Sequence, residues 1–181
     1  LDALEQYHRK YPLRIGIPRE ELKSRLKLVP RIYNALVQYL LAAEVIHEER
    51  GFFKKTGHEI RFNADQQKNI SRLMAEFERN LAAPPTVKDS RQVTGDEVYD
   101  ALVATGQLIQ LTPEVVYTGR QYEKMVRELK DWLAQKGSIT VAEYRDRYGT
   151  SRKYALAFLE YMDQVGVTIR EGDNRKLNPR R

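Results

Sequence analysis

The sequence predicts a mainly α-helical chain with small β-hairpins, and three observations support this prediction. Segments with apolar residues at helical spacing alternate with short β-prone runs. Proline and glycine stand where these helices begin or end. The same order of elements returns after about 60 residues. Of the 181 residues, 41% are hydrophobic and 31% charged, which supplies a core and excludes a wholly disordered chain.

The first unit, residues 1–64, is predicted to hold three helices. Residues 1–11 carry Leu and Tyr at helical spacing and stop at Pro12. Pro18 and the acidic residues after it predict the start of a second helix, because proline and carboxylates both favour a first turn. Pro30 precedes an apolar stripe that predicts the third helix.

The last unit, residues 119–181, repeats this scheme more clearly. Residues 122–135 are amphipathic, and Gly137 ends that helix where a C-cap glycine belongs. The elements predicted next are a strand at 138–141, a short helix at 142–148 and a helix that opens at 149–151 and closes at Gly166.

A hairpin follows the third helix of both units. In the first unit, β-prone runs at 45–55 and 59–62 surround a glycine and charged residues. In the last unit, the strands 167–170 and 175–177 flank the polar turn 171–174.

The middle unit, residues 65–118, fits the scheme less well. The elements predicted there are a helix at 67–81, a turn at 83–87, a helix at 96–105 and a hairpin from runs 108–111 and 115–117. We interpret it as a third copy whose second helix is degenerate. Three helices followed by a hairpin form a winged helix, a variant of the helix-turn-helix. The prediction is therefore tandem winged-helix domains at 1–64, 65–118 and 119–181.

Composition limits the possible functions. The chain has no cysteine, which excludes disulfides, thiolate metal sites and cysteine nucleophiles and favours the cytoplasm. No apolar window is long enough to span a membrane, and no secretory signal opens the chain. The three histidines, His8, His47 and His58, are not spaced as metal ligands, and there is no glycine-rich phosphate loop. The sequence therefore predicts neither catalysis nor a cofactor.

The net charge of +6 suggests an anionic partner. Basic residues exceed acidic ones by 12 to 8 in residues 1–64 and by 13 to 9 in residues 121–181, whereas residues 65–120 have 6 against 8. Ordinary solubility explains such an excess equally well. A basic stretch between Arg9 and Arg31 is a second candidate anion site, although a solvated face with Glu20 and Glu21 interspersed is the preferred interpretation.

The best candidate site is the start of the last predicted helix together with the hairpin wing after it. Hydroxyls and cations stand on a first turn, where free N–H groups and the helix dipole favour phosphate. Polar residues at the wing tip are suited to contact exposed bases. The candidate residues are Arg145, Ser151, Arg152, Lys153, Tyr154, Arg170, Asp173, Asn174 and Arg175. The alternative interpretation makes Ser151 a plain N-cap, Asp173 and Asn174 a plain turn, and Tyr154 a core residue.

These residues carry a resemblance to a known family. The runs Ile139–Asp146 and Thr150–Leu156, with the wing Gly172–Arg175, resemble the last domain of the bacterial selenocysteine-specific translation elongation factor, the SelB family. At the front, Tyr7–Arg14 and Pro18–Leu22 are similar to an earlier winged helix of the same region.

The resemblance implies that the chain binds an mRNA hairpin beside a UGA codon recoded for selenocysteine. Arg145, Ser151, Arg152, Lys153 and Tyr154 would then line the stem backbone, and Arg170, Asp173, Asn174 and Arg175 would reach the hairpin loop. It also implies contact with the ribosome, a monomeric state, and GTP, Mg²⁺ and selenocysteyl-tRNA binding by domains that are missing here. The fold alone leaves two alternatives open, a DNA-binding transcriptional regulator and a protein-interaction scaffold.

Overall fold

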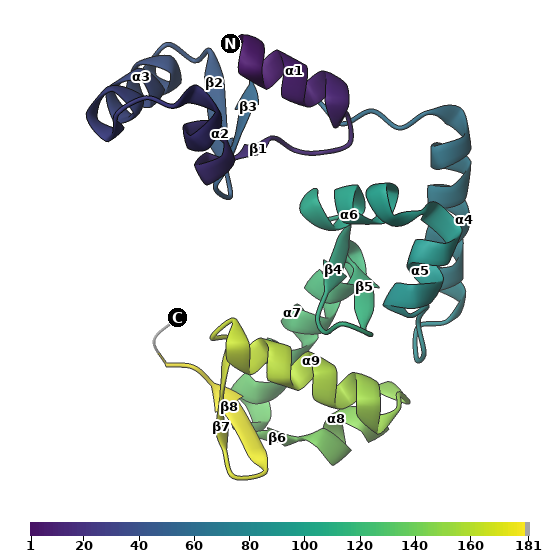
Figure 1. The fold of residues 1–181 in the computed structure, drawn as a ribbon. Coiled ribbons are helices and arrows are strands. Elements are labelled where there is room, and N and C mark those ends of the chain that lie inside the picture. The colour runs from purple at the N-terminus through teal and green to yellow at the C-terminus, as the bar shows by residue number, and fades with distance from the viewer. Residues whose placement is uncertain (180–181) are drawn as a thin grey trace. The chain divides into compact units, whose positions relative to one another are not determined.

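A computed structural model describes residues 1–179 and resolves two compact units, Leu1–Ala64 and a second unit that begins at Asp65 (Figure 1). Both units are mainly helical, with small antiparallel sheets. The fold is a series of winged helices, as the sequence predicts. Among the described residues, no helix has the length and hydropathy needed to cross a membrane.

The first unit has three helices and a three-stranded sheet. Its elements are α1 (Asp2–Lys10), β1 (Ile17–Pro18), α2 (Arg19–Leu26), α3 (Pro30–Ala42), β2 (Ile46–Glu49) and β3 (Phe52–Lys55). The strands lie in the order β1-β3-β2, all antiparallel. Ile17 and Phe53 pair at the centre of the sheet and are both fully buried, so the helices pack on this point.

The predicted strand at 59–62 is wrong. The hairpin closes earlier, at Arg50 and Gly51, which both adopt positive φ as a tight two-residue turn requires. The two strands it joins are then fully paired with each other, and residues 59–62 have no partner strand. Local β-propensity does not suffice here, because residues 59–62 do not pair with the sheet although β1 and β2 are its edge strands.

The second unit starts with three helices and a two-stranded hairpin. These elements are α4 (Ala64–Arg79), α5 (Val87–Thr94), α6 (Asp96–Ala104), β4 (Leu108–Gln110) and β5 (Val116–Thr118). The short helix α5 starts with a complete capping box, in which Thr86 and Asp89 exchange side-chain-to-backbone hydrogen bonds. It stands where the sequence showed only a turn and a degenerate helix.

The same unit continues with a second set of helices and a three-stranded sheet. Its elements are α7 (Gly119–Lys136), β6 (Ile139–Thr140), α8 (Val141–Tyr148), α9 (Arg152–Gln164), β7 (Thr168–Glu171) and β8 (Asn174–Leu177). The strand order β6-β8-β7 repeats that of the first unit.

The apolar core of the second unit continues across residue 118. Leu111, Val115 and Tyr117 from the hairpin belong to the same buried cluster as Leu129 of α7 and Phe158 of α9. Domain boundaries at residues 64 and 118, and a last domain of 119–181, therefore stay predictions, and residues 180–181 lie outside the described part. The hairpin and the last winged helix pack as one body.

The first and last winged helices match residue by residue from their first strand onward. A constant offset of 122 relates Ile17 to Ile139, at the start of β1 and β6. The same offset relates Thr56 to Asn178 and Val45 to Val167. The Thr56 amide donates to the Val45 carbonyl oxygen, and the Asn178 amide donates to that of Val167. Helices α2 and α8, and likewise α3 and α9, have identical lengths and corresponding bounds. Any residue of one winged helix can therefore be compared with its counterpart in the other.

A stacked histidine pair makes the first unit sensitive to acid. His8 and His58 have ring centroids 3.6 Å apart, and the Lys55 amide donates to Nε2 of His8 at 3.3 Å. Burial, and next the neighbouring His58, lower the pKa of His8 to about 4 from 6.5. Between these values only the unfolded chain binds the proton, so we expect the first unit to lose about 1–2 kcal/mol of stability as the pH falls from 6.5 to 4, allowing for partial solvent exposure.

Hydrogen exchange of the Lys55 amide, corrected for intrinsic rates, measures this loss. The exposed His47 provides the control, since His47→Gln should keep the pH dependence and His8→Gln should remove it. An unchanged pH dependence in His8→Gln would contradict the assignment.

Candidate nucleic-acid interface

A groove of about 370 Å³ opens on the last winged helix, between the beginnings of α8 and α9 and the β7–β8 hairpin. Its charged side chains are Arg152 from α9, Arg170 from β7, Asp173 from the turn and Arg175 from β8. Its remaining lining residues are Thr140, Val141, Ala142 and Leu156. Three arginines against one aspartate give the groove a positive charge, and the predicted helix start and wing therefore meet on one surface.

Local sequence signals build the helix starts at this groove. Thr140 and Glu143 form a capping box, with the Thr140 amide donating to Oε2 of Glu143 at 2.7 Å, so α8 begins beside the groove. Gly149 has a left-handed conformation with φ of 59° and ends α8, which leaves only two residues before α9. Ser151 is the N-cap of α9, and its side chain makes no capping hydrogen bond. The first amides of α9 and the Ser151 hydroxyl are therefore available to an anion.

The arginines at the edges of the groove have no carboxylate partner among the described residues. Arg152 is exposed in the first turn of α9. The side chain of Arg170 is held along the wing, because its Nε donates to the Gly172 carbonyl oxygen at 2.9 Å. Asp173 and Asn174 are exposed at the turn that follows. These positions suit phosphate contacts at the helix and base contacts at the turn.

Arg175 occupies a different place from the one predicted. It was expected to reach a hairpin loop from the wing, but its residue is only 1% exposed because β8 pairs on both sides, with β6 and with β7. Its Nε donates to Oδ2 of Asp163 at 3.0 Å, and Thr168 donates to Oδ1 of the same carboxylate at 2.5 Å. The Nη2 atom of Arg175 has no partner among the described residues, although it is buried.

The first winged helix shows that this polar network is not needed for packing. The counterparts of Asp163, Thr168 and Arg175 at the constant offset are Leu41, Ile46 and Phe53, all apolar. A buried ion pair is seldom more stable than well-packed apolar residues in its place. The fold therefore does not require the pairing of Arg175 with Asp163 in the groove wall. The groove residues Arg152, Arg170 and Asp173 likewise correspond to Pro30, Glu48 and Gly51, so the first winged helix has no such cationic groove.

Three of the residues at the α8–α9 turn contact the preceding segment of the same unit. Thr150 donates to the Ala82 carbonyl oxygen at 2.6 Å, and the Tyr154 hydroxyl donates to that of Pro84 at 3.2 Å. Lys153 forms an ion pair with Glu114, which raises the pKa of the lysine through their hydrogen bond. The structure therefore brings Arg152 into the groove but directs Lys153 and Tyr154 toward residues 82–84 and 114.

The remaining predicted residue, Arg145, lies on α8 and forms an ion pair with Asp146 at 2.6 Å. Two polar residues were not predicted: Thr140, which lines the groove, and Asp163, which holds Arg175. Asp163 carried a usable signal, because it is a lone acid that replaces an apolar residue when the two winged helices are aligned.

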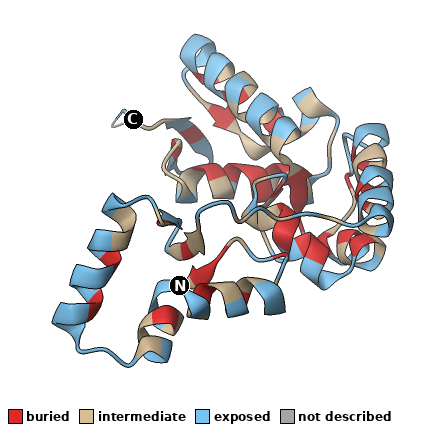
Figure 2. Cartoon of the chain, turned by 90° about the horizontal axis from the view of Figure 1, so that it is seen from above, coloured by how far each residue is buried: buried red, intermediate tan, exposed pale blue. Residues whose placement is uncertain are grey.

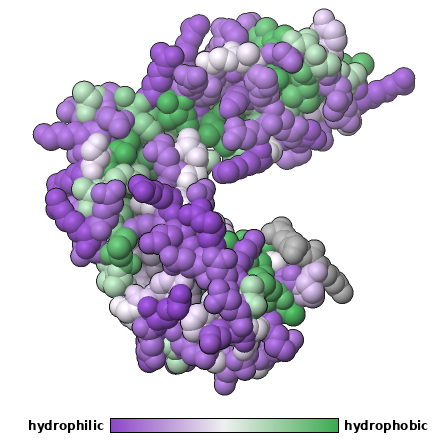
Figure 3. Space-filling view, turned by 180° about the vertical axis from the view of Figure 1, so that it is seen from behind, coloured by the Kyte–Doolittle hydropathy of each residue, from purple (hydrophilic) through white to green (hydrophobic). Residues whose placement is uncertain are grey.

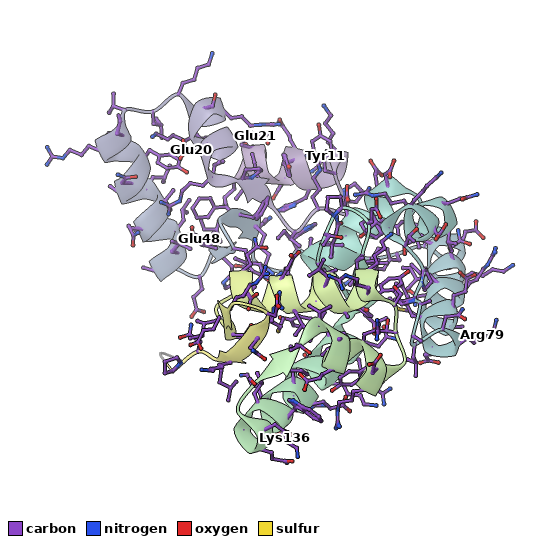
Figure 4. The ribbon with its side chains drawn as sticks, turned by 90° about the horizontal axis from the view of Figure 1, so that it is seen from below. Tyr11, Glu20, Glu21, Glu48, Arg79 and Lys136 are labelled. Atoms are coloured by element: carbon purple, nitrogen blue, oxygen red, sulfur yellow. The ribbon has the colours of Figure 1, made fainter. Side chains whose placement is uncertain are left out.

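The basic stretch of the first unit is partly neutralised. Glu20 and Glu21 of α2 and Glu48 of β2 lie among its cations (Figure 4). Arg25 pairs with Glu21 at 2.7 Å and Arg19 with Glu48 at 3.2 Å. This pairing agrees with the interpretation of a solvated face.

Comparison with known proteins identifies the family. The model of the second winged-helix domain of SelB, described as "Elongation factor SelB, winged helix", matches residues 1–54, and the model of the third, with the same description, matches residues 131–177. Together the two ranges cover more than half of the chain. The chain belongs to the SelB family. The family resemblance found in the sequence is thereby confirmed.

Relatives in the SelB family match almost the whole chain. The selenocysteine-specific elongation factor of Desulfomicrobium baculatum is 25% identical over 188 residues, covering 99% of this chain. That of Escherichia coli is 27% identical over 187 residues, covering 98%. This chain spans 30% of the length of either relative.

A solved SelB structure is also similar. The mRNA-binding domain of E. coli SelB in complex with SECIS RNA matches with a TM-score of 0.51 and 26% identity, over 65% of this chain and 99% of that one.

Proposed function

We propose that this SelB-family chain binds an mRNA hairpin of the SECIS type through the groove of its last winged helix. Through this binding it tethers a selenocysteine-specific elongation factor beside a recoded UGA codon. The groove itself carries the proposal, since it joins three arginines to a free helix N-terminus in the winged helix that matches the third SelB domain. The similar E. coli domain was solved with SECIS RNA, which supports the choice of ligand.

The chemistry of the groove suits a folded RNA. The deep, narrow major groove of an A-form stem does not admit a helix, so a protein grips phosphates along the stem and reads unpaired bases in the loop. Arg152, Ser151 and the first amides of α9 hold the phosphates, with Arg145 beside them. Asp173 and Asn174 contact loop bases from the wing, and Arg170 neutralises the adjacent backbone.

Arg175 forms the floor of this site. Asp163 accepts the hydrogen bond from Nε and so fixes the guanidinium plane, while the part of the side chain that lines the groove contacts the RNA. Lys153 and Tyr154 take another role, because both already bind the preceding segment. They hold the N-terminal end of α9 in place against residues 82–84 and 114.

The chain is the part of a translation factor that binds mRNA, and it acts in the cytoplasm as a monomer at the ribosome. Catalysis and cofactor binding belong to other parts of the factor, which supply the GTP and Mg²⁺ site and the site for selenocysteyl-tRNA. The charged groups of the groove, three arginines and one aspartate, are suited to binding phosphates and base edges.

Titration of the chain with a short RNA hairpin and with a DNA duplex of the same stem sequence tests the proposal. We expect tight binding to the hairpin and binding to the duplex that is weaker by at least about tenfold. Equal affinity for both would favour a DNA-binding regulator. A lack of any salt-dependent binding would favour a protein scaffold.

Arg152→Ala is expected to weaken hairpin binding and to lower the slope of log affinity against log salt by about one, because one phosphate contact is lost. Arg127→Ala is the matched control, since Arg127 is an exposed arginine on α7 outside the groove. Titrations between about 50 and 200 mM salt measure both slopes. Equal salt slopes in the two variants would show that Arg152 does not contact a phosphate of the hairpin.

A further inference from the structure

Helix α3 of the first winged helix presents an exposed apolar stripe. Val29 at its N-cap is 64% exposed, Ile32 is 53% exposed and Tyr39 is 69% exposed. Leu36, at 36%, lies between them on the same face, since the spacing of three and four residues follows the helical repeat. Most of α3 is coloured as exposed in Figure 2, and apolar side chains reach the surface in this part of the first unit in Figure 3.

The matching stripe of the last winged helix is covered. The counterparts of Ile32, Leu36 and Tyr39 at the constant offset are Tyr154, Phe158 and Tyr161. Phe158 is fully buried, with its ring centroid 6.4 Å from that of Tyr122, and Tyr161 lies 6.0 Å from the same ring. Tyr154 contacts Tyr117 at 6.5 Å and donates to the Pro84 carbonyl oxygen.

All of this cover comes from residues before position 124, which corresponds to Asp2 at the start of α1. Pro84 lies in the link between α4 and α5, Tyr117 lies in the hairpin strand β5, and Tyr122 lies in the first turn of α7. Helix α7 has 18 residues, whereas the corresponding α1 has 9. The second unit therefore shows how the segment before a winged helix can cover the apolar stripe of its third helix, here α9.

The charge pattern of α3 selects a protein partner over a nucleic acid. Its one charged residue is Arg31, which is the counterpart of Lys153. Lys153 pairs with Glu114, which lies in the turn of the preceding hairpin. An apolar stripe beside one cation offers little to phosphates, but it fits an aromatic surface that carries a carboxylate.

We infer that this stripe, Val29, Ile32, Leu36 and Tyr39, is the docking surface for a preceding winged-helix module. That module supplies an aromatic residue from its hairpin and a carboxylate for Arg31, and the segment that joins the hairpin to α1 supplies a further aromatic residue. The matched family model is that of the second SelB winged helix, so a first one stands before it in the family. The inference rests on the proposed function only in treating the chain as part of a longer factor.

Thiol labelling tests the inference, because the chain has no cysteine of its own. Tyr39→Cys places one thiol on the stripe, and Gln38→Cys places the control thiol on the neighbouring exposed face of α3. Iodoacetamide labelling is followed by mass spectrometry of the peptide that holds the thiol. Each variant is measured in this chain alone, in a chain extended by the preceding winged helix, and in the full-length factor.

We expect labelling at position 39 to slow by at least about tenfold in both longer proteins, with less than about twofold change at position 38. Ile32→Cys repeats the measurement with the Tyr39 ring intact, in case that ring is needed for docking. Arg31→Glu should restore fast labelling at position 32, because the carboxylate of the partner would then be repelled.

Fast labelling at both stripe positions in the extended chain would overturn the inference. Slow labelling that appears only in the full-length factor would place another domain on the stripe and would also overturn it. Slow labelling in this chain alone would indicate a second copy or cover from within the chain. None of these readouts involves RNA, so failure of hairpin binding would overturn the proposed function without touching this result.

Discussion

The triple variant Asp163→Leu, Thr168→Ile and Arg175→Phe is expected to lose hairpin binding while remaining folded. It gives the last winged helix the apolar residues that the first has at the same positions. Replacing a buried ion pair by apolar residues of similar volume is commonly neutral or stabilising. Affinity for the hairpin should fall by about 10- to 100-fold, because one arginine contact of about 1–3 kcal/mol is lost.

Hairpin titration and thermal unfolding of the same preparation measure the two effects. Thr168→Ile alone is the control, since it leaves Asp163 and Arg175 paired and should keep most of the affinity. A folded triple variant that binds as tightly as the parent would show that Arg175 is not part of the RNA site.

Asp163→Leu alone is expected to lower the free energy of unfolding by about 3 kcal/mol. It removes the carboxylate from a guanidinium group whose side chain is 1% exposed, while Asp163 itself is 23% exposed. A buried charge without its partner costs far more than the pair contributes. The value lies at the lower end of the range for buried pairs because water still reaches the aspartate side.

Urea unfolding followed by fluorescence measures this loss, since the only tryptophan, Trp132, lies in α7 beside the same core. Adding Arg175→Phe to Asp163→Leu should restore most of the stability, which gives a coupling energy between the two positions. If Asp163→Leu were as stable as the parent, the buried guanidinium of Arg175 would not need the carboxylate of Asp163.

Local rules in the sequence were sufficient for most helices and strands. Pro18 is the N-cap of α2 and Pro30 opens α3, while Gly137 and Gly149 cap α7 and α8, because these residues act within one turn of chain. The run at 59–62 failed because strand propensity is only a local preference, and no strand of the sheet pairs with these residues.

The candidate site was predicted in part for a related reason. The location of Arg152 and Arg170 at one groove could be expected, because a helix start and the hairpin wing after it are features of local sequence. The position of Arg175 depended on which sheet face it occupies, and the roles of Lys153 and Tyr154 depended on residues about 40 to 70 positions away. No local pattern contains that information.

The sequence by itself determined the repeated order of helices and hairpins, the limits of most of these elements and the family. These follow from hydrophobic periodicity, from proline and glycine, and from motifs read along the chain. Only the tertiary structure decided which cations face the groove and which form contacts within the protein. The tertiary structure also showed that the apolar stripe of α9 is covered, whereas the corresponding stripe of α3 is exposed. Burial and ion pairing are properties of residues brought together from distant segments, so they exist only once the chain has folded.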